Sequence, residues 1–265
     1  MTTSRLIVAA ACAAGLVSVP ALAEDLTIVY KTTSSNGSGT STSYYSAERL
    51  RTGDADRDTV IEYGPGRIVS IDHKKREYSE ITLAEMETAM KAAAAKMEQA
   101  SAQMKQQMAN MPPAMREKME GMMGGGAAAV TVTKGSVRKV AGYDCQDYDI
   151  KMGTSMDMHL CASTAIAPPA PNVDLRSYAS VAGPASALAA NPMFKGFAKL
   201  GEEMKKIQGF MLAESTSLKI MGRSMDSTKE ASEVKRGPIP ASAFDVAAIA
   251  KGYKKVESPM LKMAK

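Results

Sequence analysis

Residues 143–162 read YDCQDYDIKMGTSMDMHLCA and decide the fold, because they describe a complete β-hairpin. Apolar and polar side chains alternate on both sides of Gly153, as in strands that bury one face. The apolar face comprises Tyr148, Ile150, Met152, Met156, Met158 and Leu160, and the polar face comprises Asp147, Asp149, Asp157 and His159. The hairpin therefore predicts an antiparallel sheet with its apolar face in the core.

Similar short runs surround this hairpin on both sides. Alternating segments separated by turn residues lie at 26–33, 42–50, 59–63, 67–71, 76–81, 130–140, 212–221 and 223–235. Runs of this length, bounded by Gly, Pro, Ser and Asp, are typical of an antiparallel meander.

A stripe of methionines interrupts the strands. Thr82 and Glu85 form a T-x-x-E capping box, which predicts a helix over residues 83–110. Six methionines fall within about 60° of its circumference. They are Met86, Met90, Met97, Met104, Met108 and Met111. Methionine adapts its shape to apolar partners, so the stripe predicts a surface that contacts something hydrophobic.

Two more helical stretches are expected, at residues 114–123 and 173–206. The order of strands, long helix, strands, helices and strands predicts an α+β fold, in which helices pack on one side of a curved antiparallel sheet. One domain over residues 24–265 is expected, with residues 82–126 as a Met-rich helical insertion.

The N-terminus has the pattern of a secretory signal peptide. Arg5 supplies the positive charge, residues 6–19 the apolar run, and Ala21-Leu22-Ala23 the cleavage site. Residues 1–23 are therefore expected to be removed after Ala23, which predicts a periplasmic or secreted protein. Cys145 and Cys161 then remain as an even pair in an oxidising compartment, and the hairpin predicts a disulfide between them on its polar face.

Charge and motifs argue against several functions. The net charge is only +5 and the basic residues are scattered, which argues against a nucleic-acid partner. His73 has only Asp72 as an acidic neighbour in sequence, so no oriented nucleophile and base are apparent, and we expect no enzymatic activity. Asp54, Asp56 and Asp58 lack the glycine and glutamate of a calcium loop and predict a solvated turn. No cofactor and no metal site are expected.

Three stretches carry a resemblance to a known family: Val69–Tyr78 (VSIDHKKREY), Val140–Asp149 (VAGYDCQDYD), and Pro238–Phe244 (PIPASAF) followed by Gly252–Lys255 (GYKK). Together they resemble the exported domain-of-unknown-function family 4412. That family is similar to the lipoprotein-carrier superfamily of LolA, LolB and LppX-like proteins. The resemblance implies an open half-barrel with helices against its concave face and a hydrophobic cavity between them, which holds acyl chains.

We therefore expect a monomeric exported protein that binds a hydrophobic small molecule, a lipid or a lipidated protein without transforming it, with transient contact to a membrane surface. The residues expected to line its cavity are Met90, Met97, Met104 and Met108 from the long helix, and Tyr148, Ile150, Met158 and Leu160 from the sheet. Two alternatives stay open. Met-rich segments also suit Cu(I), with Met156–Cys161 as a candidate site, and the long helix could serve a structural or interaction role.

Overall fold

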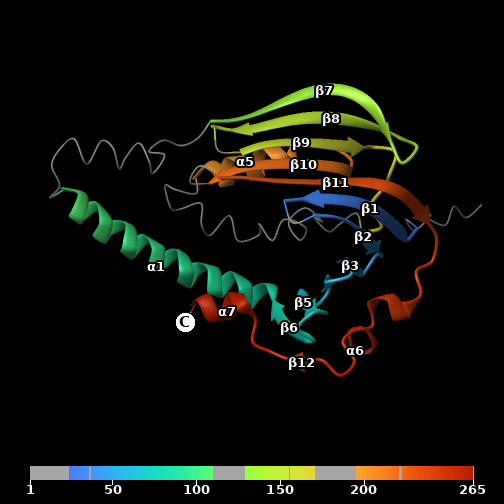
Figure 1. Ribbon diagram of the computed structural model, residues 1–265, viewed down its shortest axis with the longest axis horizontal. Coiled ribbons are helices and arrows are strands. Elements are labelled where there is room, and N and C mark those ends of the chain that lie inside the picture. Colours follow the sequence, from blue (N-terminus) through green and yellow to red (C-terminus); the bar gives the residue numbers. More distant parts are fainter. Residues whose placement is uncertain are drawn as a thin grey trace, which may run out of the picture.

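The structure, a computed structural model, describes residues 24–35, 37–109, 129–154, 156–170, 195–220 and 223–264. Its main feature is one curved twelve-stranded sheet (Figure 1) with the strand order β12-β6-β5-β4-β3-β2-β1-β11-β10-β9-β8-β7. The strands are β1 (Leu26–Ser34), β2 (Gly37–Tyr45), β3 (Arg49–Gly53), β4 (Arg57–Glu62), β5 (Arg67–Asp72), β6 (Glu77–Thr82), β7 (Val130–Val140), β8 (Tyr143–Met152), β9 (Met156–Ser163), β10 (Phe210–Ile220), β11 (Arg223–Arg236) and β12 (Lys254–Lys255).

Two meanders make up this sheet. Strands β1–β6 and β7–β11 each run antiparallel between sequence neighbours, and the pairing of β1 with β11 joins them. The short β12 pairs parallel with β6. The predicted meander is therefore present, although β2 begins at Gly37, inside a stretch that the sequence assigned to a turn.

The expected α+β class, with helices packed along the concave face, is wrong. Most described residues are in strands. Besides the long helix α1, the described helices are short: α5 (Lys195–Lys205), η2 (Ala241–Phe244), α6 (Val246–Ile249) and α7 (Pro259–Ala264). The 27-residue helix α1 (Leu83–Ala109) starts at the capping box, where Thr82 and Glu85 exchange hydrogen bonds. It packs against α7 and the end of β6 and then extends past the edge of the sheet (Figure 1).

The burial of side chains along α1 shows that most of this helix does not pack on the sheet, although such packing was predicted for the helices. Met86 and Ala89 are buried in its first two turns and Met90 is half-buried, but beyond residue 94 every described side chain is exposed. An apolar stripe can bury only the part of a helix that lies against another element. The side chains of Met97, Met104 and Met108 lie outside the described residues.

The hairpin of β8 and β9 forms as predicted. Met152 pairs with Met156, Ile150 with Met158 and Tyr148 with Leu160, so these six side chains share one face. Helix α5 covers part of this face with Leu200 and Met204.

The predicted disulfide between Cys145 and Cys161 is present, with 5.5 Å between the Cα atoms. It lies on the predicted face, which also carries Asp147 and His159, but that end of the face is not polar, because both cysteines are fully buried beside Val140, Ile166 and Leu212. The pairing also differs by two residues, since Cys161 lies opposite Asp147. The disulfide therefore belongs to a core cluster on the second face of the sheet.

Replacing both cysteines by alanine should lower the free energy of unfolding by about 3 kcal/mol, because the bond closes a loop of sixteen residues and fills a packed position. Denaturant unfolding of the oxidised protein and of the double variant measures this difference.

A thiol assay on denatured, unreduced protein that begins at Glu24 should find no free thiol, and two reactive thiols would contradict the pairing.

Candidate functional site

A row of alternating charges crosses β3, β4 and β5. Arg49 lies opposite Glu62 in the β3–β4 register, and Glu62 lies opposite Arg67 in the β4–β5 register. Directly opposed residues of an antiparallel pair project from the same face, so the three side chains lie on one surface. This row forms the floor of the candidate site.

Ion pairs fix most of the floor. Glu62 accepts two hydrogen bonds from Arg67, from Nε at 2.9 Å and from Nη2 at 3.1 Å, and Glu80 lies 3.6 Å from Nη1 of the same guanidinium. Glu80 in turn accepts a 2.7 Å hydrogen bond from Lys255. The hydrogen bond to Glu62 raises the pKa of Arg67, and the hydrogen bond to Glu80 raises the pKa of Lys255. Both bases are therefore held in their charged forms.

The C-terminal segment, defined here as residues 238–256, crosses the same face of β3–β6. It carries η2 and α6, and its apolar side chains Val246, Ile249 and Ala250 pack on Val60 and Val69 of the sheet. Asp245 caps α6 by accepting hydrogen bonds from the backbone N–H groups of residues 247 and 248. The segment therefore forms a second layer on this part of the sheet.

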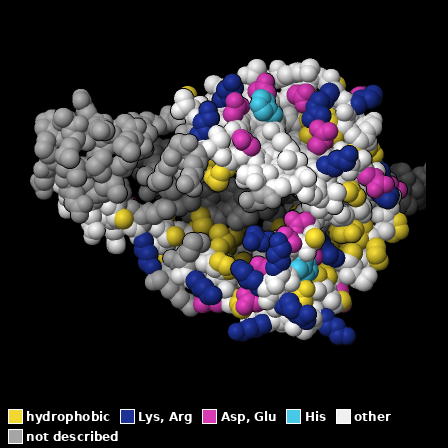
Figure 2. Space-filling model, in the orientation of Figure 1, with side chains coloured by type: hydrophobic (Ala, Val, Ile, Leu, Met, Phe, Trp, Pro, Cys, Tyr) yellow, Lys and Arg dark blue, Asp and Glu magenta, His cyan; other side chains and the backbone are white. Residues whose placement is uncertain are grey.

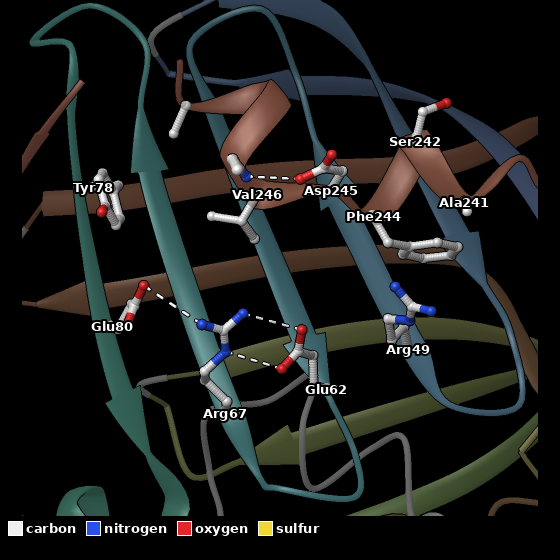
Figure 3. Close-up of a pocket in the computed structure, with 12 residues that line it drawn as sticks. Arg49, Glu62, Arg67, Tyr78, Glu80, Ala241, Ser242, Phe244, Asp245 and Val246 are labelled. Atoms are coloured by element: carbon white, nitrogen blue, oxygen red, sulfur yellow. Dashed lines mark hydrogen bonds and ion pairs between the residues drawn. The ribbon is translucent and has the colours of Figure 1, made fainter. Parts of the chain in front are cut away.

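A pocket of about 650 Å³ remains between the segment and the charged floor (Figure 3). The segment contributes an apolar roof, in which Phe244 and Val246 face the floor. The complete lining is Arg49, Glu62, Arg67, Tyr78, Glu80, Ala241, Ser242, Phe244, Asp245, Val246, Ala247 and Ala250. The pocket can thus accept a ligand with an apolar body on one side and charged groups on the other.

A polar clasp holds the segment beside this pocket. Asp58 is buried and accepts two hydrogen bonds from Arg51, at 2.9 and 2.8 Å, while His73 Nε2 lies 2.9 Å from its second oxygen. His73 Nδ1 lies 3.0 Å from the Tyr253 hydroxyl, and Arg51 donates a hydrogen bond to the carbonyl of Ala243. One carboxylate therefore links the sheet to both halves of the C-terminal segment.

This clasp corrects two interpretations of the sequence. His73 does have an acidic partner besides Asp72, and Asp58 does not belong to a solvated turn, although Asp54 is exposed and Asp56 half-exposed in the preceding turn. His73 and Tyr253 lie in the VSIDHKKREY and GYKK motifs, two of the stretches that resemble family 4412, and this shared resemblance was the one signal in the sequence for both residues. Nothing in the local sequence indicated that the two motifs meet.

The residues predicted to line a cavity lie elsewhere. Ile150 and Leu160 are buried, and Tyr148 and Met158 are half-buried at the margin of the same packed cluster beneath α5. Met90 is on α1, whose main contacts are with α7 and β6 rather than with β8 or β9. The structure brings the four sheet residues together, and the predicted roles of Met97, Met104 and Met108 concern side chains outside the described residues.

Two further observations concern metal ions and membrane spans. Among the described residues, no three His, Cys, Asp or Glu side chains are grouped so that they could hold a metal ion. No helix in the same part of the chain combines the length and apolar character needed to cross a membrane.

No protein-family model matches the chain, and a search of well-described proteins found no match. Among solved structures, an uncharacterized conserved protein from Thermus thermophilus is similar over 89% of this chain and 92% of its own, with 8% identity and a TM-score of 0.44. A chain of the Pseudomonas aeruginosa MucA/MucB complex is similar over 89% of this chain, with 10% identity and a TM-score of 0.41. This chain spans 59% of that chain. These values do not establish a family or a function, and the resemblance to family 4412 stays a prediction.

Replacing Asp58 by alanine should lower the free energy of unfolding by about 3 kcal/mol, because Arg51 and His73 would lose their shared buried partner. Amide hydrogen exchange should show the loss of protection most strongly in residues 238–256. Asp56→Ala is the matched control, since this side chain pairs with Lys74 in an exposed position and should change stability by less than about 1 kcal/mol. Equal effects of the two variants would contradict the clasp.

Proposed function

We propose that this chain is an exported, non-enzymatic binding protein that holds a hydrophobic ligand, a lipid or another acyl chain, in the pocket beneath its C-terminal segment. The observation that carries the proposal is the volume of about 650 Å³ beneath an apolar roof. Ligand sites of small molecules fall in the range of about 300–1,000 Å³.

The roof supplies the apolar contact. Phe244, Val246, Ala247 and Ala250 line it. Phe244 and Ala250 are already buried, whereas Val246 is half-buried and Ala247 is exposed. An acyl chain that covers Val246 and Ala247 would remove apolar surface from water, which is favourable by about 25 cal/mol per Å². The C-terminal segment therefore supplies the apolar contact to the ligand.

The floor suits a ligand that is held but not transformed. The carboxylates of Glu62 and Glu80 are engaged by Arg67 and Lys255, so these side chains are fixed by ion pairs. Fixed charges can orient a ligand, whereas acyl transfer or hydrolysis would need a nucleophile beside an oriented base. The signal-peptide pattern and the buried disulfide support the exported location.

Ligand content is the direct test. Native mass spectrometry of the protein purified from the periplasm, followed by organic extraction, should reveal a co-purifying lipid. The delipidated protein should bind a fluorescent fatty acid. The absence of both a co-purifying lipid and fatty-acid uptake would overturn the proposal.

Filling the pocket should abolish binding without unfolding the protein. Ala247 lines the pocket and its side chain is exposed, so Ala247→Phe should weaken fatty-acid binding at least about tenfold by occupying the ligand's space. Ala248→Phe is the matched control, because this neighbour is equally exposed and does not line the pocket. Fluorescence titration measures both affinities, and equal affinities would place the ligand elsewhere.

A further inference from the structure

Arg49 differs from the other charged side chains of the pocket. Among those that line it in the described part of the chain, the side chain of Arg49 alone takes part in no hydrogen bond, and the carboxylate nearest to it is Glu48 at 3.9 Å. Glu48 is almost fully exposed to solvent, so this ion pair contributes little. The guanidinium of Arg49 therefore keeps its five N–H donors available.

The register explains why this guanidinium has no strong partner. Glu62 lies directly opposite Arg49, but both of its oxygens accept hydrogen bonds from Arg67 on the other side. One carboxylate thus lies between two guanidinium groups and forms its bidentate pair with only one of them. The row of Arg49, Glu62 and Arg67 therefore contains one guanidinium group, that of Arg49, without a bidentate carboxylate partner.

Phe244 orients the remaining cation. Its buried ring lies 5.4 Å from the guanidinium carbon of Arg49. A cation over an aromatic face is attracted by the ring, and this attraction uses none of the guanidinium's hydrogen bonds. Arg49 is thereby held at the boundary between the apolar roof and the charged floor, as Figure 3 shows.

The other charged groups of the site already have partners. Glu62, Arg67, Glu80 and Lys255 form a chain of two acids and two bases, and the Asp245 carboxylate keeps its negative charge while it accepts hydrogen bonds from backbone N–H groups of α6. Figure 2 shows Lys and Arg side chains interspersed with acidic and hydrophobic ones in the lower part of the view.

We infer that the ligand is an anionic single-chain amphiphile, whose carboxylate or phosphate head binds the free donors of Arg49 while its acyl chain lies against Val246 and Ala247. The inference rests on the proposed function and adds the chemical class of the head group. A guanidinium fork matches both carboxylate and phosphate in a bidentate geometry. The hydrogen bonds to a charged head should favour an anionic ligand over a neutral one of equal chain length by about tenfold or more.

Three ligands of equal chain length test this inference on the delipidated full-length mature protein. Isothermal titration calorimetry should show that decanoate and decyl phosphate bind at least about tenfold more tightly than decanol. The better of the two anions identifies the head group. Equal affinity for all three would overturn the inference and leave the proposed function standing, whereas binding of none would overturn the proposed function itself.

Variants at position 49 assign the effect to this side chain. Arg49→Gln should remove the preference for the anions over decanol, and Arg49→Lys should retain part of the preference through its charge. Glu48→Gln is the matched control and should retain the full preference. Thermal unfolding of each variant shows that it folds, and an Arg49→Gln protein that is folded and still prefers the anions would contradict the assignment.

Discussion

The pairing of β1 with β11 is the constraint on which the rest of the structure depends. Its ladder runs from Leu26 opposite Arg236 to Ser34 opposite Ser227, and it is the only junction between the two meanders in the described sheet. The ladder also sets where the C-terminal segment begins. Asp25 accepts hydrogen bonds from the backbone N–H groups of Gly237 and Ile239, so the chain leaves β11 beside the start of β1 and turns back over β3–β6.

Two unlike interactions then hold the segment on the sheet. Small apolar side chains of α6 pack on Val60 and Val69, and the buried carboxylate of Asp58 joins Arg51 and His73 to the segment's ends. A buried carboxylate is costly unless it is fully paired, and here two cationic or hydrogen-bonding partners satisfy it. Gly53 allows this arrangement, because a Cβ atom at that position would collide with the Asp58 carboxylate.

Local features of the sequence predicted local features of the structure. The alternation around Gly153 predicted the hairpin and its apolar face, and Thr82 with Glu85 predicted the start of α1. The periodicity of apolar side chains could not predict which element, if any, covers a given face of a strand or helix. It therefore assigned the cysteines to a polar surface, and it could not say which element the stripe of methionines contacts. The contact of His73 with Tyr253 joins residues far apart in the chain, and no pattern of spacing encodes it.

The pocket shows why the site could not be found as a motif. In the sequence, nothing distinguishes Arg49, Glu62 and Arg67 from other charged residues. Only the registers of the β3–β4 and β4–β5 pairs place them in one row. Once they are aligned, one carboxylate cannot form bidentate pairs with both neighbours, and its pair with Arg67 leaves Arg49 beneath the C-terminal segment. The preference for an anion that we infer thus rests on the guanidinium that strand pairing leaves without a bidentate partner, and the position of the roof depends on how the β1–β11 ladder directs the chain.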